Sequence, residues 1–227
     1  MPRLCFAVMV GCVAAGLWSC AVTEQARDVK FSGFLGDYTK LQPGGSGEPL
    51  YVYINQKANF RAYDQAVVEP ATVWREKGAN PGDVSPQDLK RLAVSLEAKI
   101  LEALRHEGIK IVKQPGPGVM KIRSALTEAQ EASVAMDLVT AALPVPSVSK
   151  LATGTRAFAG KVSIEGEMSD SQTGEVLAAM VDRRAGARNP IAVRDSWADV
   201  EKAFQYWSDR FAYRLCLLQG KANCVPP

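Results

Sequence analysis

The sequence predicts an α+β domain in which a mostly antiparallel sheet is packed on one face by two main helices. Two stretches, 86–107 and 197–218, carry apolar residues at spacings of three and four, the period of an amphipathic helix. Residues 158–184 instead alternate apolar and polar side chains on either side of a turn, which is typical of a β-hairpin with one solvated face. We assign the domain to residues 50–220, followed by a short tail, 221–227.

An apolar segment opens the chain, with Arg3 ahead of it. It is shorter than the roughly 20 apolar residues that cross a bilayer, and it fits the hydrophobic part of a secretory signal peptide. Small Ser19 precedes Cys20, a pattern that resembles the lipobox of bacterial lipoproteins. We therefore predict a signal peptide over 1–19, cleavage between Ser19 and Cys20, and acylation of Cys20. An ordinary signal peptide that is cut elsewhere is the alternative.

The residue after the predicted acylation site is Ala21, where an Asp would resemble an inner-membrane retention signal. In a Gram-negative bacterium this predicts a protein anchored in the outer membrane by N-terminal acyl chains, with its domain in the periplasm. Several chains on one Cys would hold the protein stably, because each buried methylene contributes about 0.8 kcal/mol.

Residues 20–49 are predicted to form a lipidated tether, since 42–49 is rich in Gly, Pro and Ser. Within it lies an aromatic motif, residues 31–38. Exposed aromatic side chains are unfavourable in water, so we expect this motif to dock on the domain or on a partner. Its candidate contact residues are Phe31, Phe34, Leu35 and Tyr38.

The shorter strands come next along the chain. Residues 51–54 and 66–69 read as strands, and Pro70 ends the second because proline cannot donate to a sheet. Residues 109–112 and 119–126 flank a Pro-Gly-Pro-Gly turn and are predicted to form an antiparallel hairpin.

The two helices have recognisable starts. Ser85 and Pro86 give the first a capping residue and a proline at its first position, and Gly108 ends it. Ser196 and Asp199 form a second capping pair. Between the two predicted helices, apolar residues within 134–155 are interrupted by prolines. This stretch is predicted to cover the sheet, and the alternative is a loop that contacts lipid or a partner.

Cysteine and charge usage limit the partners. Net charge is only +3, so no nucleic-acid surface is predicted. Cys216 and Cys224 form an even pair in an oxidising compartment, and we favour a disulfide between them over two free thiols.

Catalytic motifs are not found. The only histidine, His106, lies in the last helical turn, where a cation is favoured by the helix dipole, and one histidine cannot build the usual zinc site. Glu165 and Glu167 share a strand face and could serve as a glycosidase pair, but alternation alone places charges on a solvated face. We predict no catalytic residue, no metal and no cofactor.

Three blocks of sequence together resemble a family of bacterial lipoproteins that is defined only as a domain of unknown function. They are residues 32–38, Tyr63-Asp64 with Glu69-Pro70, and 170–184, the last being the most specific. The resemblance covers most of the predicted mature chain. It implies a lipoprotein and transfers no catalytic residue.

The leading hypothesis is a non-enzymatic envelope lipoprotein that acts as an accessory or assembly subunit and binds another envelope component. The alternative is a lipid- or small-ligand-binding module that uses the space between sheet and helices, and a hydrolase comes third. A filled core with Phe34, Leu35 and the 134–155 loop exposed would favour a partner surface. A large closed apolar cavity between sheet and helices would favour a ligand carrier, and a polar cleft with converging carboxylates would favour an enzyme.

Overall fold

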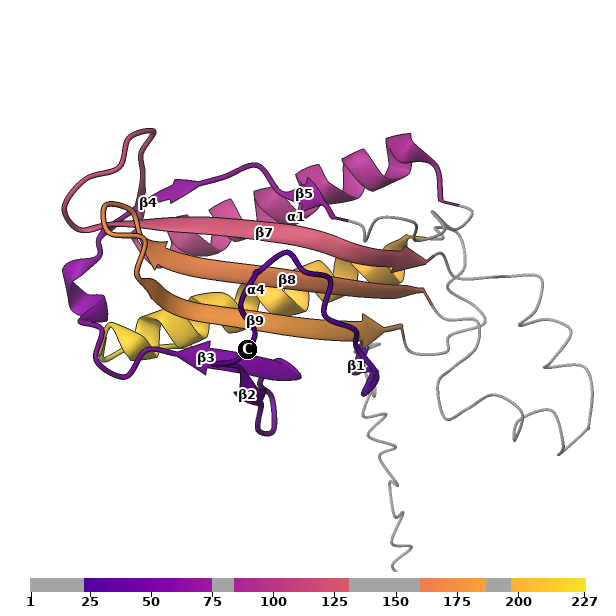
Figure 1. The fold of residues 1–227 in the computed structure, drawn as a ribbon, viewed down its shortest axis with the longest axis horizontal. Helices are drawn as coiled ribbons and strands as arrows, with labels where there is room; N and C mark the ends of the chain where they lie inside the picture. The colour runs from indigo at the N-terminus through magenta and orange to yellow at the C-terminus, as the bar shows by residue number, and fades with distance from the viewer. Residues whose placement is uncertain (1–22, 75–83, 131–159, 187–196) are drawn as a thin grey trace, which may run out of the picture.

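The computed structural model describes residues 23–74, 84–130, 160–186 and 197–227. These residues form one nine-stranded sheet with two long helices on one face (Figure 1). The predicted α+β class is therefore confirmed. The elements are β1 (Glu24–Gln25), β2 (Gln42–Pro43), β3 (Tyr51–Ile54), the 3₁₀ turn η1 (Phe60–Ala62), β4 (Gln65–Val68), β5 (Thr72–Val73), α1 (Pro86–His106), β6 (Lys110–Ile111), β7 (Val119–Gln130), β8 (Lys161–Asp170), β9 (Val176–Ala185) and α4 (Ala198–Leu218).

The middle of the sheet is antiparallel. Its order is β2-β3-β9-β8-β7-β4-β6, with β1 also paired to β9 and β5 to β7. Strands β3, β9, β8 and β7 form successive antiparallel pairs, whereas β4 and β5 run parallel to β7. The parallel part follows from the helix α1, which lies between β4 and β6 in the chain and acts as a crossover.

The hairpin of β8 and β9 forms as the alternation predicts. Oδ1 of Asp170 accepts hydrogen bonds from the backbone N–H groups of Gln172 and Thr173, at 2.9 and 2.7 Å. Gly174 completes the turn with a φ of 73°, a conformation that glycine adopts without steric cost. These donors hold the pKa of Asp170 below its ordinary value.

The predicted hairpin of 109–112 with 119–126 is wrong. Strands β6 and β7 both pair parallel with β4, so that Gln65 lies opposite Lys110 on one side and Val119 on the other. The segment between β6 and β7 brings the chain back along the sheet, so that both strands start opposite Gln65 and run in the same direction. With only two residues, β6 offers too short a ladder to fix a hairpin with β7.

Both helices pack their apolar stripes on the same face of the sheet. Oγ of Ser85 accepts a hydrogen bond from the backbone of Asp88 at 3.0 Å, so the predicted cap starts α1. Helix α4 begins one residue after the predicted Trp197. The two clusters beneath the helices contain Leu89, Leu92, Leu96, Val162, Ile164, Val200, Phe204 and Trp207 in one, and Leu104, Met120, Ile122, Met168, Leu177 and Leu215 in the other.

The opposite face of the sheet is covered by residues from the predicted tether. Strands β1 and β2 join the sheet, and the segment between them crosses β8 and β9 in front of the sheet in Figure 1. Phe34 and Leu35 are buried against Ala125 and Val181. Residues 23–49 thus contribute two strands and a cover to the domain.

This cover overturns one expectation. Glu165 was predicted to lie on a solvated face, yet its side chain is fully buried, with 0% of its surface exposed. The alternation of β8 does place it away from the helices. Sequence periodicity identifies the two faces of a strand, but it does not show that a distant segment will cover the second one.

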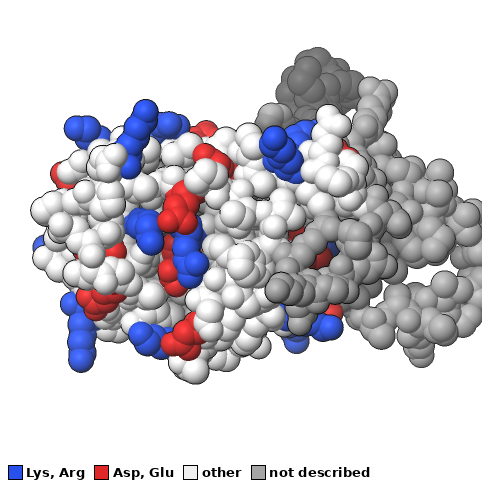
Figure 2. Space-filling model, turned by 45° about the horizontal axis from the view of Figure 1, so that its top comes forward, with Lys and Arg blue, Asp and Glu red and all other residues white. Residues whose placement is uncertain are grey.

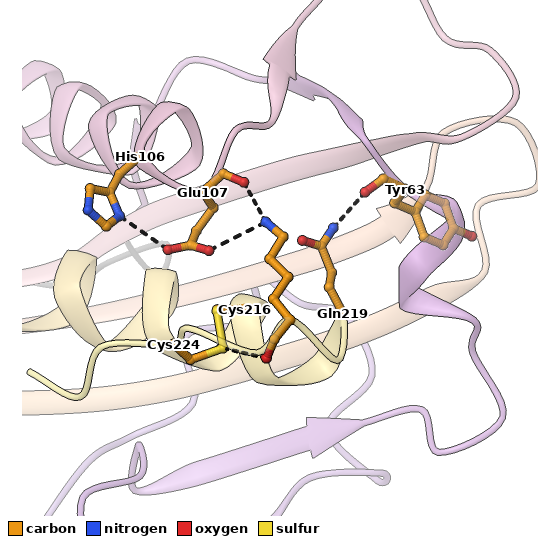
Figure 3. A network of polar contacts seen from close by, with 7 residues as sticks. Tyr63, His106, Glu107, Cys216, Gln219 and Cys224 are labelled. Carbon is orange, nitrogen blue, oxygen red and sulfur yellow. Dashed lines mark hydrogen bonds and ion pairs between the residues drawn. A yellow bond between two sulfur atoms is a disulfide. The ribbon is translucent and has the colours of Figure 1, made fainter.

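The end of α4 is fixed to the rest of the domain by its last residues (Figure 3). A disulfide joins Cys216 to Cys224. Nζ of Lys221 donates to the backbone carbonyl of Glu107, and Nε2 of Gln219 donates to the carbonyl of Tyr63 at 2.6 Å. These contacts tie the ends of the two helices together.

Several predicted features lie outside the described residues. These are Ser19 and Cys20, the signal peptide 1–19, the capping residue Ser196, and the apolar stretch within 134–155. Within the part of the chain that the structure describes, neither helix is sufficiently long and apolar to cross a bilayer.

Candidate functional site

A cavity of about 170 Å³ lies between the sheet and the two helices. Its position follows from the fold, because α4 packs over β8 and β9 while β3 continues the sheet beyond the helix (Figure 1). The cavity lies where the helix-side face of β3 and β9 meets α4, whose residues from Phe204 to Leu218 contribute to its lining. A cavity of this size is comparable to engineered apolar cavities that stay dry and accept benzene.

The floor of the cavity comes from paired positions of β3 and β9. Val52 lies opposite Met180, and Ile54 opposite Ala178. All four are only partly buried, although both strands have neighbours on each side. Their exposure to the cavity is what leaves them incompletely buried.

A glycine in β8 deepens this floor. Gly166 lies opposite Met180, and a Cβ placed on it would be 3.6 Å from Met180 Cγ, an ordinary contact distance. The backbone of Gly166 does not need positive φ. The position therefore has room for a side chain, and its absence leaves space in the middle of the sheet.

The walls of the cavity are apolar. Helix α1 contributes Leu96 and Ile100, and α4 contributes Phe204, Phe211 and Leu215. Such a lining offers few hydrogen bonds to water and favours an apolar occupant. The sequence analysis did not identify this site, because its residue types are those of an ordinary core; the small residues Gly166 and Ala178 on neighbouring strands are the signal that could have indicated it.

The mouth of the cavity is formed by the loop Gly47–Pro49 and by α4. Gly47 has a φ of 73°, a conformation that favours glycine, and Nη1 of Arg210 lies 2.9 Å from the position that a Cβ would take there. Arg214 forms an ion pair with Glu48 of the same loop. The rim therefore carries charged groups around an apolar interior.

A buried carboxylate fixes this rim to the sheet. Asp182 is 1% exposed, and its Oδ1 accepts hydrogen bonds from Nε2 of Gln25 at 2.9 Å and from the backbone of Leu50 at 3.1 Å. Its Oδ2 accepts from Nε1 of Trp207 at 2.6 Å. Both oxygens are occupied by N–H donors, so Asp182 connects β1, the rim loop and α4 rather than offering a free base.

A second buried ion lies on the same strand. Arg184 donates through Nε to Oγ1 of Thr23 at 2.7 Å, and its guanidinium lies 3.5 Å from the ring centroid of Tyr206. Burial lowers the pKa of Arg184, an effect partly offset by Tyr206 and Asp182. The first described residues are thereby fixed beside α4.

The predicted contact residues lie on the other face of the sheet. Phe34 and Leu35 are buried in the domain itself, whereas Phe31 is 44% exposed and stacks on Tyr38 with 4.4 Å between ring centroids. Phe31 and the neighbouring Trp74, 40% exposed, leave a small apolar surface. The motif therefore docks mainly on its own domain, one of the two expectations for it.

Glu165 is held under this motif. Its Oε1 accepts from the backbone of Ser32 at 2.7 Å and its Oε2 from Tyr38 at 2.6 Å. Burial, followed by the hydrogen bond to Glu165, raises the pKa of Tyr38. Glu167 pairs instead with Arg123 at 2.9 Å. The two carboxylates have separate partners, an arrangement that differs from an acid pair converging on a substrate.

Charge on the surface is mixed. On the face seen in Figure 2, basic and acidic side chains alternate instead of forming a patch of one sign. His106 is exposed and contacts Glu107 at 3.2 Å. Among the described residues, no group of three or more His, Cys, Asp or Glu side chains could hold a metal ion.

Comparison of the sequence with known families identifies one match. Residues 30–211 match the profile of the family described as "Protein of unknown function (DUF3313)". The chain belongs to this family. The predicted membership of a family defined only as a domain of unknown function is confirmed. A search of curated proteins finds no match.

Solved structures with a similar arrangement have low sequence identity. The PelC dodecamer from Paraburkholderia phytofirmans is 11% identical, with a TM-score of 0.39, and the alignment covers 76% of this chain and 96% of that one. Protein XCC0632 from Xanthomonas campestris is 12% identical, with a TM-score of 0.42 and coverage of 74% and 91%. A minor lipoprotein from Acinetobacter baumannii is 7% identical, with a TM-score of 0.36 and coverage of 68% and 94%. Similarity at this level does not transfer a function.

Proposed function

We propose that this protein is a lipid-anchored envelope protein without catalytic activity that takes an apolar group into the cavity between its sheet and α4. The cavity carries this function. Its floor of Val52, Ile54, Ala178 and Met180 is apolar and only partly buried. The burial of Phe34 and Leu35 removes much of the surface on which the leading hypothesis from the sequence, partner binding, relies.

The size of the cavity limits what it can bind. A volume of about 170 Å³ equals that of about five or six water molecules, and so roughly as many methylene groups. At about 0.8 kcal/mol for each buried methylene, such a chain would contribute about 4–5 kcal/mol. This free energy corresponds to a dissociation constant in the millimolar to sub-millimolar range, before the entropy lost by ordering the ligand is subtracted. Binding of this strength is reversible.

Binding is tested with an uncharged chain. The mature protein carrying Cys20→Ala is titrated with 1-decanol, and methyl NMR shifts of Ile54 and Met180 are followed. We expect saturable shifts confined to the cavity. Gly166→Val should abolish them, because its methyl groups would occupy the same space, and it should not weaken the fold, since valine favours strands and glycine does not. Absence of saturable shifts in the parent protein would exclude the cavity as a binding site.

The anchor is tested separately. Cys20→Ala should prevent acylation and release the protein from membrane fractions into the soluble periplasmic fraction of the host. A Cys20→Ala protein that sediments with membranes as completely as the wild type would contradict the anchoring.

A second function keeps some support. Phe31 and Trp74 remain exposed beside the motif, and a subunit of an envelope assembly could use them as a contact. Site-specific crosslinking from position 31 in intact cells tests this function. Recovery of no discrete partner band would count against it.

A further inference from the structure

Arg210 lines the cavity and has no ion-pair partner among the described residues. It is partly buried, its Nε is shielded from solvent without a hydrogen-bond partner, and no carboxylate of the described residues pairs with it. Its guanidinium packs against Gly47 and lies 5.4 Å from the ring centroid of Tyr206. A buried donor without a partner is unfavourable, so this side chain is prepared for an anionic acceptor.

The other charges around the mouth are already matched. Arg214 pairs with Glu48, and the oxygens of Asp182 are held by three N–H donors. Arg184 is buried, donates to Thr23 and places its guanidinium against the ring of Tyr206. Arg210 therefore remains without a carboxylate partner among the described residues, whereas Arg214 and both oxygens of Asp182 have theirs.

The mouth also lies next to the part of the chain that leads from the predicted anchor. Nε2 of Gln25 donates to the backbone carbonyl of Glu48 in the rim loop at 2.9 Å. Gln25 comes five positions after Cys20, a span of at most about 18 Å when fully extended. An acylated Cys20 would hold the mouth close to the membrane surface, where single-chain lipids are available.

We propose that the cavity binds a fatty acid, with its hydrocarbon chain between β3 and α4 and its carboxylate on Arg210. This inference rests on the proposed function and specifies the ligand. The cavity has room for part of one chain and not for the two chains of a phospholipid. One unmatched guanidinium fits the single charge of a carboxylate, with which arginine forms bidentate hydrogen bonds.

The test compares two chains of equal length that differ in their head group. The Cys20→Ala protein is titrated with decanoate and with 1-decanol at pH 7.5 by calorimetry and by methyl NMR. Decanoate should bind about tenfold more tightly, the usual effect of a charge-assisted hydrogen bond. Arg210→Gln should remove this difference, Arg210→Lys should keep part of it, and the exposed Arg105→Gln should leave it unchanged.

The outcomes separate the two proposals. If decanol binds and decanoate binds no more tightly, or if Arg210→Gln leaves the difference intact, the fatty-acid assignment is wrong while the apolar site stands. If neither compound binds the parent protein, both proposals fail. Far-UV circular dichroism of each variant checks that it is folded, and Arg210→Lys covers the case in which Arg210→Gln is not.

Discussion

Tyr38 donates its hydroxyl hydrogen to Oε2 of Glu165 at 2.6 Å, across the face of the sheet that the helices leave free. The backbone of Ser32 supplies a second donor to the same carboxylate. Isolated carboxylates are very unfavourable inside a protein, so Glu165 depends on these donors. A segment that precedes the central strands in the chain thereby satisfies a charge in the middle of the sheet.

The first prediction concerns this contact. Tyr38→Phe should lower the free energy of unfolding by about 1–3 kcal/mol, because a buried carboxylate loses a donor. Urea denaturation at pH 7 measures the change. Tyr53→Phe is the matched control, since Tyr53 lies on the same face and its hydroxyl makes no hydrogen bond within the described part of the chain. Equal stability of the two variants would show that the Tyr38 hydroxyl does not support Glu165.

The second prediction concerns alkaline pH. Burial, followed by the hydrogen bond to Asp170, raises the pKa of Tyr63 to about 12 from 10.0. A group whose pKa is raised on folding stabilises the protein fully below its unfolded pKa and loses this contribution as pH rises through the folded value. Stability should therefore fall between pH 10 and 12, and less steeply in Tyr63→Phe. Parallel curves for the two proteins in denaturant titrations would contradict this.

The third prediction concerns the C-terminal disulfide. Replacing both Cys216 and Cys224 by Ala should lower the free energy of unfolding by about 2–3 kcal/mol, since the bond closes a short loop and restricts the unfolded chain. It should also free the residues between them, including Lys221, from the end of α1. Hydrogen exchange of that segment provides the local readout. Identical exchange with and without the bond would mean that the tail is held by its hydrogen bonds alone.

The fourth prediction concerns the rim of the cavity. Trp207→Phe removes the indole donor from Oδ2 of Asp182 and should cost about 1–3 kcal/mol of stability. Trp74→Phe is the control, because its indole N–H donates to Ser32 at an exposed position and should cost less. Chemical denaturation of both variants compares them. A smaller loss for Trp207 than for Trp74 would exclude Asp182 as a buried connection.

Local periodicity predicted much of this fold. The apolar spacing that follows the cap at Ser85 predicted α1, and the alternation on both sides of the turn at Asp170 predicted β8 and β9. The parallel pairing of β4 with β6 and β7 was not predictable in this way, because it depends on contacts between residues that are distant in the chain. A two-residue strand such as β6 contains too few positions for a pattern.

The candidate site was less predictable than the fold. Val52, Met180 and Phe211 have the residue types of an ordinary core, and only the geometry of α4 relative to β3 leaves space between them. The sequence did identify Phe34 and Tyr38 as residues that should pack on a surface, since aromatic side chains exposed to water are unfavourable. It did not show that this surface contains Glu165, whose strand pattern is that of a solvated face.

The pairing of β1 and β3 with β9 also determines when the sheet can form. Thr23 and its partner Arg184 are 161 positions apart, and β1 and β3 both pair with β9, which comes late in the chain. The predicted signal peptide implies a chain that is exported with its N-terminus first. Strand β1 and the short pair of β2 with β3 would then lack their place in the sheet until β9 had crossed, so such a chain would complete its sheet only after export.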